Sequence, residues 1–242
     1  MTVYPLFIPT GLIIAVDGPA ASGKTTVGLR FAKLIRAICL DTGIMYRAVA
    51  LAALNSKIDP LDEPAVVEVA ERINIQVKPA SVKDGRSYDV LIDGADVTWE
   101  IRSDGVNRSV SEVSVYKGVR RAMTLRQQDI ARAGNIVMLG RDIGTVVLPD
   151  ADLKFYLNAS AEVRAQRRYE EEKKRGVILD LSEVIASIKH RDVLDSSRKH
   201  APLKPAEDAI TINTDTLSIE QVVDRMIVEV NTVLRKHSFT CD

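Results

Sequence analysis

The segment that decides the fold is Gly18-Pro19-Ala20-Ala21-Ser22-Gly23-Lys24-Thr25-Thr26, which matches the pattern G-x-x-x-x-G-K-[ST]. An apolar run, Leu12–Val16, precedes this segment and is typical of a buried strand. The apolar residues after it recur at helical spacing: Val27, Phe31, Leu34 and Ile35. A strand, a glycine-rich loop and a helix in this order direct backbone N–H groups and a helix N-terminus at one point. This order favours phosphate binding over an ordinary glycine-rich turn.

Two side chains of this loop have distinct predicted roles. Lys24 is expected to reach the terminal phosphates of a bound triphosphate. The Thr25 hydroxyl is expected to ligate Mg²⁺. We therefore predict that residues 18–26 together bind ATP and that Mg²⁺ accompanies it.

The composition limits the kinds of partner. In 242 residues, 33 Lys and Arg balance 33 Asp and Glu, so no overall field favours nucleic acid or a membrane surface. No apolar stretch approaches the roughly 20 residues that span a bilayer, and the first ten residues lack the pattern of a signal peptide. The two cysteines, Cys39 and Cys241, argue against a disulfide framework or a zinc site. We expect a cytoplasmic monomer that binds neither nucleic acid nor membrane.

The chain order predicts an α/β fold. A second apolar strand at 37–41 follows the first helix, and a βαβ unit of this kind makes a parallel sheet. Strands at 135–139, 154–157 and 209–212 would complete five. Alternating residues at 75–77 and 89–93, with a third short strand starting at Val97, predict a small antiparallel insertion. Helices are expected at 24–36, 42–54, 63–72, 103–109, 116–133, 162–175, from Ser182 (as N-cap) to about 195, and after a cap at Ser218.

Polar residues follow the predicted parallel strands at the edge where ligands bind. Thr42 and Arg47 come after the second strand, and Arg47 could clamp a second phosphate. The alternative is a capping threonine with a solvated arginine. Arg141 and Asp142 follow the third strand and could supply a bidentate arginine and a hydrogen-bonding carboxylate. A structural salt bridge is the alternative there.

Charged residues also recur on two predicted helices. Arg191, Asp195 and Arg198 share one face if their helix continues that far, although in isolation this pattern favours a solvated salt-bridge ladder. Arg164 and Arg168 share a face of another helix, which is either a charged surface helix or a mobile lid that brings arginine to a transferring phosphate. With arginines on several segments and no Asn-Lys-x-Asp segment to bind guanine, the chain is better explained as a small-molecule kinase than as a switch protein.

With these residues in place, the sequence closely resembles the bacterial cytidylate (CMP) kinases, a family of P-loop nucleoside monophosphate kinases. The resemblance runs from about Leu12 to Leu234. Its markers are Asp17–Ala20, Leu40–Gly43 with Tyr46-Arg47, Gly140–Val147, and Arg191-Asp192 with Asp195, Arg198 and Pro202-Leu203. Residues 96–102 resemble the insertion that enlarges the monophosphate-binding part in this family.

The resemblance implies transfer of the ATP γ-phosphate to CMP, and to dCMP. By position, Lys24, Arg141, Arg164 and Arg168 are the expected catalytic residues, the last two closing over ATP. The expected acceptor-binding residues are Arg47 and Arg141 for the phosphate, Ser111, Arg120 and Asp142 for cytosine, Arg191 and Asp195 for the sugar, Arg198 near base and phosphate, and Thr42 and Tyr46. The implied organisation is a core of residues 1–54, 111–160 and 181–242, a monophosphate-binding insertion of 55–110 and a lid of 161–180.

Two departures from the family pattern carry expectations. Ala21 stands where many members have glycine, so this position should not need a positive φ. Residues 35–37 lack the glycine that often ends the first helix, which should affect packing more than chemistry. The alternatives are a P-loop kinase of UMP, AMP or shikimate, or a regulatory protein that holds ATP without rapid turnover.

Overall fold

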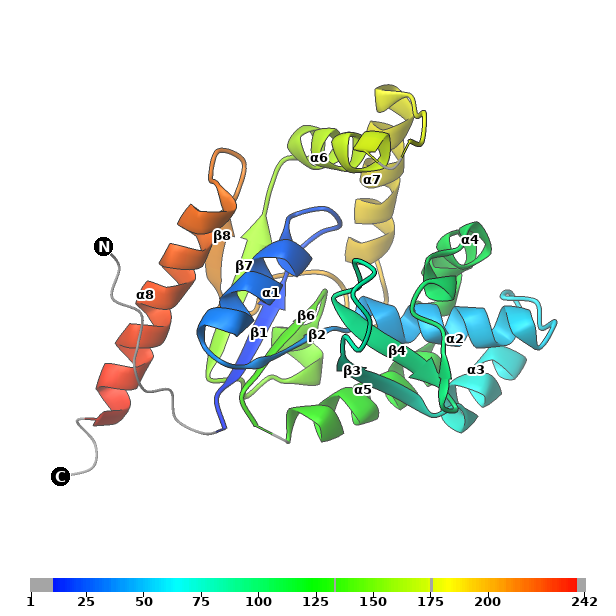
Figure 1. The fold of residues 1–242 in the computed structure, drawn as a ribbon, viewed down its shortest axis with the longest axis horizontal. Coiled ribbons are helices and arrows are strands. Elements are labelled where there is room, and N and C mark those ends of the chain that lie inside the picture. Colours follow the sequence, from blue (N-terminus) through cyan, green and yellow to red (C-terminus); the bar gives the residue numbers. More distant parts are fainter. Residues whose placement is uncertain (1–10, 133, 175, 239–242) are drawn as a thin grey trace. The chain divides into compact units, whose positions relative to one another are not determined.

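The computed structural model describes residues 11–132, 134–174 and 176–238. It divides into two compact units (Figure 1). The core unit comprises the chain up to residue 40 and from 131 onward, and the insertion unit comprises residues 41–130. Within the described ranges, no helix is both long enough and apolar enough to cross a membrane.

The main sheet confirms the predicted five-stranded parallel architecture. Its strands are β1 (Ile13–Asp17), β2 (Ile38–Asp41), β6 (Ile136–Gly140), β7 (Leu153–Asn158) and β8 (Ile210–Asn213). They run in the order β2-β6-β1-β7-β8, and β1 pairs in parallel with both β6 and β7. In this register Asp17 lies opposite Gly140 and Tyr156, so the loop after β1 starts beside the residues that follow β6.

The core of this unit is one apolar cluster on the sheet. All five residues of β6 are buried, as expected for a strand covered on both faces. Helices α1 (Lys24–Leu34) and α8 (Ile219–Ser238) supply the residues that pack against the strands. Phe31 of α1 meets Phe155 of β7 edge to face, with ring centroids 6.1 Å apart.

Helix α8 begins with the predicted cap at Ser218. The Ser218 hydroxyl accepts the N–H of Gln221 at 3.2 Å, and the Gln221 side chain accepts the N–H of Ser218 at 2.8 Å. This reciprocal pair satisfies two backbone donors that no helical carbonyl can reach.

Helices α6 (Ala161–Lys174) and α7 (Leu181–Ser196) form a hairpin in the core unit (Figure 1). The prediction that Ser182 caps α7 was wrong. Asp180 is the N-cap and accepts the Ser182 N–H at 2.6 Å, while the Ser182 hydroxyl also donates to Asp180. A carboxylate at this position adds a favourable interaction with the helix dipole. The predicted helix end at residue 175 lies outside the described residues.

The insertion unit combines helices with a small antiparallel sheet. Its elements are α2 (Gly43–Asn55), α3 (Glu63–Arg72), β3 (Ile75–Pro79), β4 (Tyr88–Ile92), β5 (Ala95–Asp96), the 3₁₀ turn η1 (Glu100–Arg102), α4 (Asp104–Val113) and α5 (Lys117–Ala131). The sheet order is β3-β4-β5.

Two boundaries in this unit differ from the prediction. The third strand ends before Val97, although the Val97 N–H still donates to Val90 O at 2.8 Å. Helix α4 continues past Ser109 to Val113, because a stripe of valines is buried along it at helical spacing: Val106, Val110 and Val113. Residue 133, the predicted end of the following helix, lies outside the described residues.

Candidate functional site

The phosphate-binding loop follows β1, and its backbone demands glycine at Gly18. This residue has φ +150°, and an added Cβ would lie 2.1 Å from the carbonyl oxygen of Leu157. Gly23, with φ +92°, is the N-cap of α1. The two glycines let the loop turn directly from the end of a buried strand into a helix N-terminus.

The expectation that Ala21 avoids positive φ was wrong, because its φ is +59°. The turn of the loop needs a left-handed residue there whatever side chain it carries, at a cost of roughly 1 kcal/mol for alanine. The Ala21 methyl group offsets part of this cost by packing, with Ala20, against the buried cluster of the α6–α7 hairpin. This packing explains how alanine is accommodated.

The side chain of Lys24 lies within the loop and is almost completely buried. Its Nζ donates to the carbonyl oxygens of Gly18 and Pro19, both at 2.7 Å. Thr25 and Thr26 are exposed at the start of α1. The amine is therefore held within the loop, and Thr25 follows it as an exposed residue.

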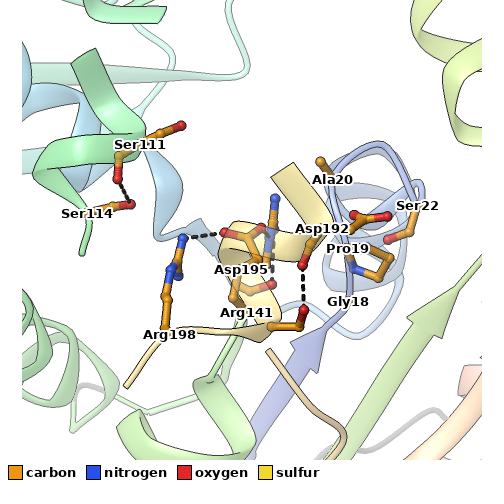
Figure 2. A network of polar contacts seen from close by, with 12 residues as sticks. Gly18, Pro19, Ala20, Ser22, Ser111, Ser114, Arg141, Asp192, Asp195 and Arg198 are labelled. Atoms are coloured by element: carbon orange, nitrogen blue, oxygen red, sulfur yellow. Dashed lines mark hydrogen bonds and ion pairs between the residues drawn. The ribbon is translucent and has the colours of Figure 1, made fainter. Parts of the chain in front are cut away.

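Asp195, on α7, joins two of the predicted arginines (Figure 2). Its carboxylate is 2% exposed, accepts a hydrogen bond from Arg141 Nε at 2.9 Å, and pairs with Arg198. Helix α7 ends at Ser196, so Arg198 lies beyond the helix and reaches Asp195 through the turn that follows. Burial alone would raise the pKa of Asp195, but the charges of Arg141, Arg198 and Arg191 outweigh it and hold the pKa below its usual value.

Arg164 and Arg168 occupy different environments although they are one turn apart on α6. Arg164 is 4% exposed and binds Asp192 of α7 through two hydrogen bonds of 2.9 and 2.5 Å. It also donates to Ala20 O of the phosphate loop at 3.1 Å. Arg168 is 43% exposed and pairs with Glu172 of its own helix at 2.7 Å. Only Arg164 therefore contacts the phosphate loop directly in these hydrogen bonds.

Asp17 is the residue whose site role the sequence did not indicate. In the sequence it was only the first residue of the family marker Asp17–Ala20. In the structure its buried carboxylate accepts the N–H groups of Ile143 and Gly144, each at 2.8 Å. Asp142, one residue before them, is also buried. An acidic residue at the end of a strand that is otherwise wholly apolar was the available signal.

In the insertion unit, Arg47 of α2 donates to Ile101 O at 3.1 Å and to Asn107 Oδ1 at 2.7 Å. These hydrogen bonds hold the Arg47 side chain against atoms of its own unit, so the side chain is not freely solvated. Thr42 occupies the N-cap position of α2, but its side chain makes no cap hydrogen bond.

Arg120 of α5 is buried and lies over the ring of Tyr46, 5.3 Å from its centroid. It also donates to Ser114 O at 3.0 Å. Ser111 lies on α4, where its carbonyl accepts the Ser114 hydroxyl at 2.9 Å. Arg120, Tyr46 and the end of α4 thus form one group.

The fold and the core-unit site together define a class of protein. A parallel sheet carries the glycine loop and Lys24 after β1, and arginines from α6 and from the end of β6 lie in the same unit. This arrangement is that of a P-loop α/β protein equipped to bind several phosphate groups.

Comparisons with known proteins identify the family within this class. The family model described as cytidylate kinase matches residues 14–232. The cytidylate kinase of Bacillus velezensis is 48% identical over 216 residues, which cover 89% of this chain and 95% of that protein. The cytidylate kinase of Bacillus subtilis is 45% identical over 216 residues, with the same shares covered. The chain belongs to the cytidylate kinase family.

One solved structure is similar in fold alone. It is described as an uncharacterized protein from Eubacterium ventriosum and is 11% identical, with a TM-score of 0.50. The match covers 91% of this chain and 98% of that chain.

Proposed function

We propose that this chain transfers the γ-phosphate of ATP to CMP, and to dCMP, to give ADP and the corresponding diphosphate. The observation that carries this proposal is the occurrence, in a member of the cytidylate kinase family, of a phosphate loop around a buried lysine together with a pair of arginines on the buried Asp195. Such a site can neutralise both the donor and the acceptor phosphates.

On the donor side, the loop would bind the ATP phosphates through its backbone N–H groups. Lys24 Nζ now donates to the carbonyl oxygens of Gly18 and Pro19. An anionic phosphate oxygen is a stronger acceptor than a carbonyl, so the amine is placed to exchange these partners for the triphosphate. We propose that Arg164, already bound to Ala20 of the loop, adds a second positive charge, and that Arg168 follows when residues 161–180 close over ATP.

The residues present also fit a Mg²⁺ ion that arrives with the nucleotide. Thr25 lies at the start of α1, and its hydroxyl is the oxygen that would hold the ion, alongside the phosphate oxygens. Among the described residues there is no group of three or more His, Cys, Asp or Glu side chains that could hold a metal ion. When bound, Mg²⁺ neutralises charge on the transferring phosphate.

On the acceptor side, we propose contacts with CMP for the residues that the family resemblance indicated. Arg141 and Arg47 would bind its phosphate, and Asp142 would accept a hydrogen bond from the cytosine amino group. Uracil has a carbonyl oxygen in place of that amino group, which the Asp142 carboxylate would repel. The other proposed contacts are Thr42, Tyr46, Ser111, Arg120, Arg191, Asp195 and Arg198, with residues 55–110 as the monophosphate-binding part.

Catalysis in this proposal needs no strong base. Lysine and arginine charges around the transferring phosphate stabilise its equatorial oxygens, and positioning of the two nucleotides supplies most of the remaining rate acceleration. Asp195 would keep the Arg141 guanidinium oriented for this task.

The test is a coupled assay of ADP release with ATP–Mg²⁺ and one acceptor at a time: CMP, dCMP, UMP, AMP or shikimate. We expect turnover with CMP and dCMP to exceed that with the other acceptors by at least about 10²-fold. A wrong acceptor would leave buried polar groups of the site without hydrogen-bond partners, and this penalty is the source of the discrimination. CMP turnover equal to the buffer blank would refute the proposal. The protein is expected to elute as a monomer in size-exclusion chromatography.

A further inference from the structure

The side chain of Asp17 connects the phosphate loop with the residues that follow β6. Asp17 is the last residue of β1, directly before Gly18 of the phosphate loop, and its side chain is turned away from solvent. Each carboxylate oxygen accepts one backbone N–H, from Ile143 and Gly144, 126 and 127 residues further along the chain. These two donors come immediately after Arg141 and Asp142, the proposed acceptor-binding residues.

The contact is built for a carboxylate rather than for any polar side chain. Two neighbouring N–H groups at the start of the short π-helix Ile143–Val147 face the two carboxylate oxygens of Asp17. An asparagine in place of Asp17 would set its own NH₂ group against one of these donors. An added Cβ at Gly144 would lie 3.5 Å from Oδ2 of Asp17, an ordinary van der Waals distance, so the contact depends on the two N–H groups rather than on the missing side chain.

The surroundings make this carboxylate costly to keep charged. Burial raises the pKa of Asp17 to about 6, against the lowering effect of the Gly144 and Ile143 hydrogen bonds. The nearby charge of Asp142 raises it further, and that of Lys24 lowers it. Tyr156, opposite Asp17 on β7, has its own pKa raised mainly by burial and also by Asp17. A charge retained at such a cost is expected where it serves activity rather than stability.

We propose that ionised Asp17 is a positioning residue that holds the Arg141-Asp142 segment in register with the phosphate loop, so that the phosphoryl acceptor is aligned with the donor. The inference rests on the proposed function for its kinetic part. Its structural part, the contact of Asp17 with Ile143 and Gly144, does not depend on the proposed function. Protonation of the carboxyl group removes one acceptor oxygen and loosens one of the two connections.

The kinetic consequence is measured at pH 7.5, because the CMP phosphate itself titrates at about pH 6 and would mask Asp17 in a kinetic pH profile. Asp17→Asn should lower kcat/KM for CMP by about 10- to 100-fold at this pH, since displacements of about 1 Å have effects of that size. ATP affinity should change less than CMP affinity.

The matched control is Asp152→Asn. Asp152 accepts a backbone N–H from Ile13, at the opposite end of the same strand, at 2.7 Å. It makes the same kind of contact to β1, away from the phosphate loop. We expect this variant to keep kcat/KM for CMP within about twofold of the parent, because it leaves the connection to residues 143–144 intact.

A structural readout separates this inference from the proposed function. In ¹⁵N-labelled parent protein without nucleotide, the amide resonances of Ile143 and Gly144 should titrate together with a midpoint near pH 6, and Asp17→Asn should abolish this titration. Asp142→Asn should move the midpoint downward, because a neighbouring negative charge is removed. If the amides titrate as expected but CMP is not phosphorylated, the proposed function fails while the connection stands.

The outcomes that would overturn the inference are specific. An Asp17→Asn protein in which the Ile143 and Gly144 amides keep the parent's titration would show that another group titrates, and a loss of activity matching its unfolded fraction would make Asp17 structural only. If Asp17→Asn does not fold, the parent protein alone decides the question: Ile143 and Gly144 amides that do not titrate near pH 6 would also refute the proposal.

Discussion

Two arginine–carboxylate clusters, one in each unit, differ in the balance of their charges. In the Asp195 cluster of the core unit, two guanidiniums, those of Arg141 and Arg198, bind one carboxylate. In the Arg86 cluster of the insertion unit, one guanidinium binds three carboxylates, with distances of 2.8 Å to Asp84, 3.0 Å to Asp89 and 2.6 Å to Asp96. The first cluster favours an added anion, and the second does not.

The clusters also differ in how far apart their members lie in the sequence. Arg141 and Asp195 are 54 residues apart, so their contact depends on the tertiary fold. The members of the Arg86 cluster all come from residues 84–96, and the nearby Trp99 indole donates to Asp84 at 2.8 Å. The local cluster therefore fastens the loop between β3 and β4 to β5. The same pair of residue types is proposed to bind a ligand in one unit and fastens a loop in the other.

The largest expected effect that tests this comparison comes from Arg141→Ala. We expect kcat/KM for CMP to fall by about 10²- to 10³-fold, because a donor to the phosphate is removed from a largely buried site. Arg141→Lys should recover only part of the loss, since an ammonium lacks the paired donors of a guanidinium. Steady-state kinetics with CMP as the varied substrate provide the measurement.

The control for Arg141→Ala is Arg86→Ala. It should leave kcat and KM within about twofold of the parent but lower the Tm by a few degrees, because three carboxylates lose their shared partner. A kinetic loss in Arg86→Ala as large as that in Arg141→Ala would break the distinction between the clusters.

An intermediate effect is expected from Arg164→Ala. Turnover should fall by about 10- to 100-fold with little change in KM for CMP, because the arginine bound to Ala20 of the phosphate loop is proposed to act on the donor side. Arg168→Ala, at a half-exposed position paired with Glu172, should have a smaller effect.

A double variant separates lost chemistry from lost stability at this position. Arg164→Ala leaves the Asp192 carboxylate without the two hydrogen bonds that it now accepts, which by itself lowers stability. Arg164→Ala with Asp192→Ala should recover much of the Tm but not the turnover. Recovery of both would mean that Arg164 only balances Asp192.

Much of the fold could be predicted because periodicity and capping act locally. Helix α3 has the predicted bounds, and the glycine loop lies between a strand and a helix as its pattern indicates. Where two neighbouring residues could both cap, as Asp180 and Ser182 could, the local pattern did not distinguish them.

The parts of the site that could not be predicted depend on distant neighbours. Arg164 and Arg168 lie one turn apart on the same face of α6. Only Arg164 is covered by α7 and the phosphate loop. The contact of Asp17 with Ile143 and Gly144 follows from strand order, which brings β1 beside β6. The φ of Ala21 is set by closure of the loop rather than by its side chain. Arg86 lies between the predicted strands at 75–77 and 89–93, and no role for it was predicted from the sequence.

The smallest expected effect is on the stability of the Arg86 cluster at acidic pH. Hydrogen bonds from Thr98, and then from Arg86, lower the pKa of Asp96 to about 2. Because the folded pKa lies below the usual value of 3.8, Asp96 stabilises the fold above pH 3.8, and this contribution is lost as the pH falls through about 2. The charge of Asp17 has the opposite effect on the stability of the fold. Because folding raises the pKa of Asp17, its ionised form destabilises the fold above pH 6. Asp96→Asn should therefore lower the urea midpoint slightly at pH 7, and the difference from the parent should shrink between pH 4 and pH 2. A difference that is constant across this range would mean that the Asp96 charge does not stabilise the loop, and a fivefold loss of kcat at pH 7 would mean that the Arg86 cluster takes part in the reaction.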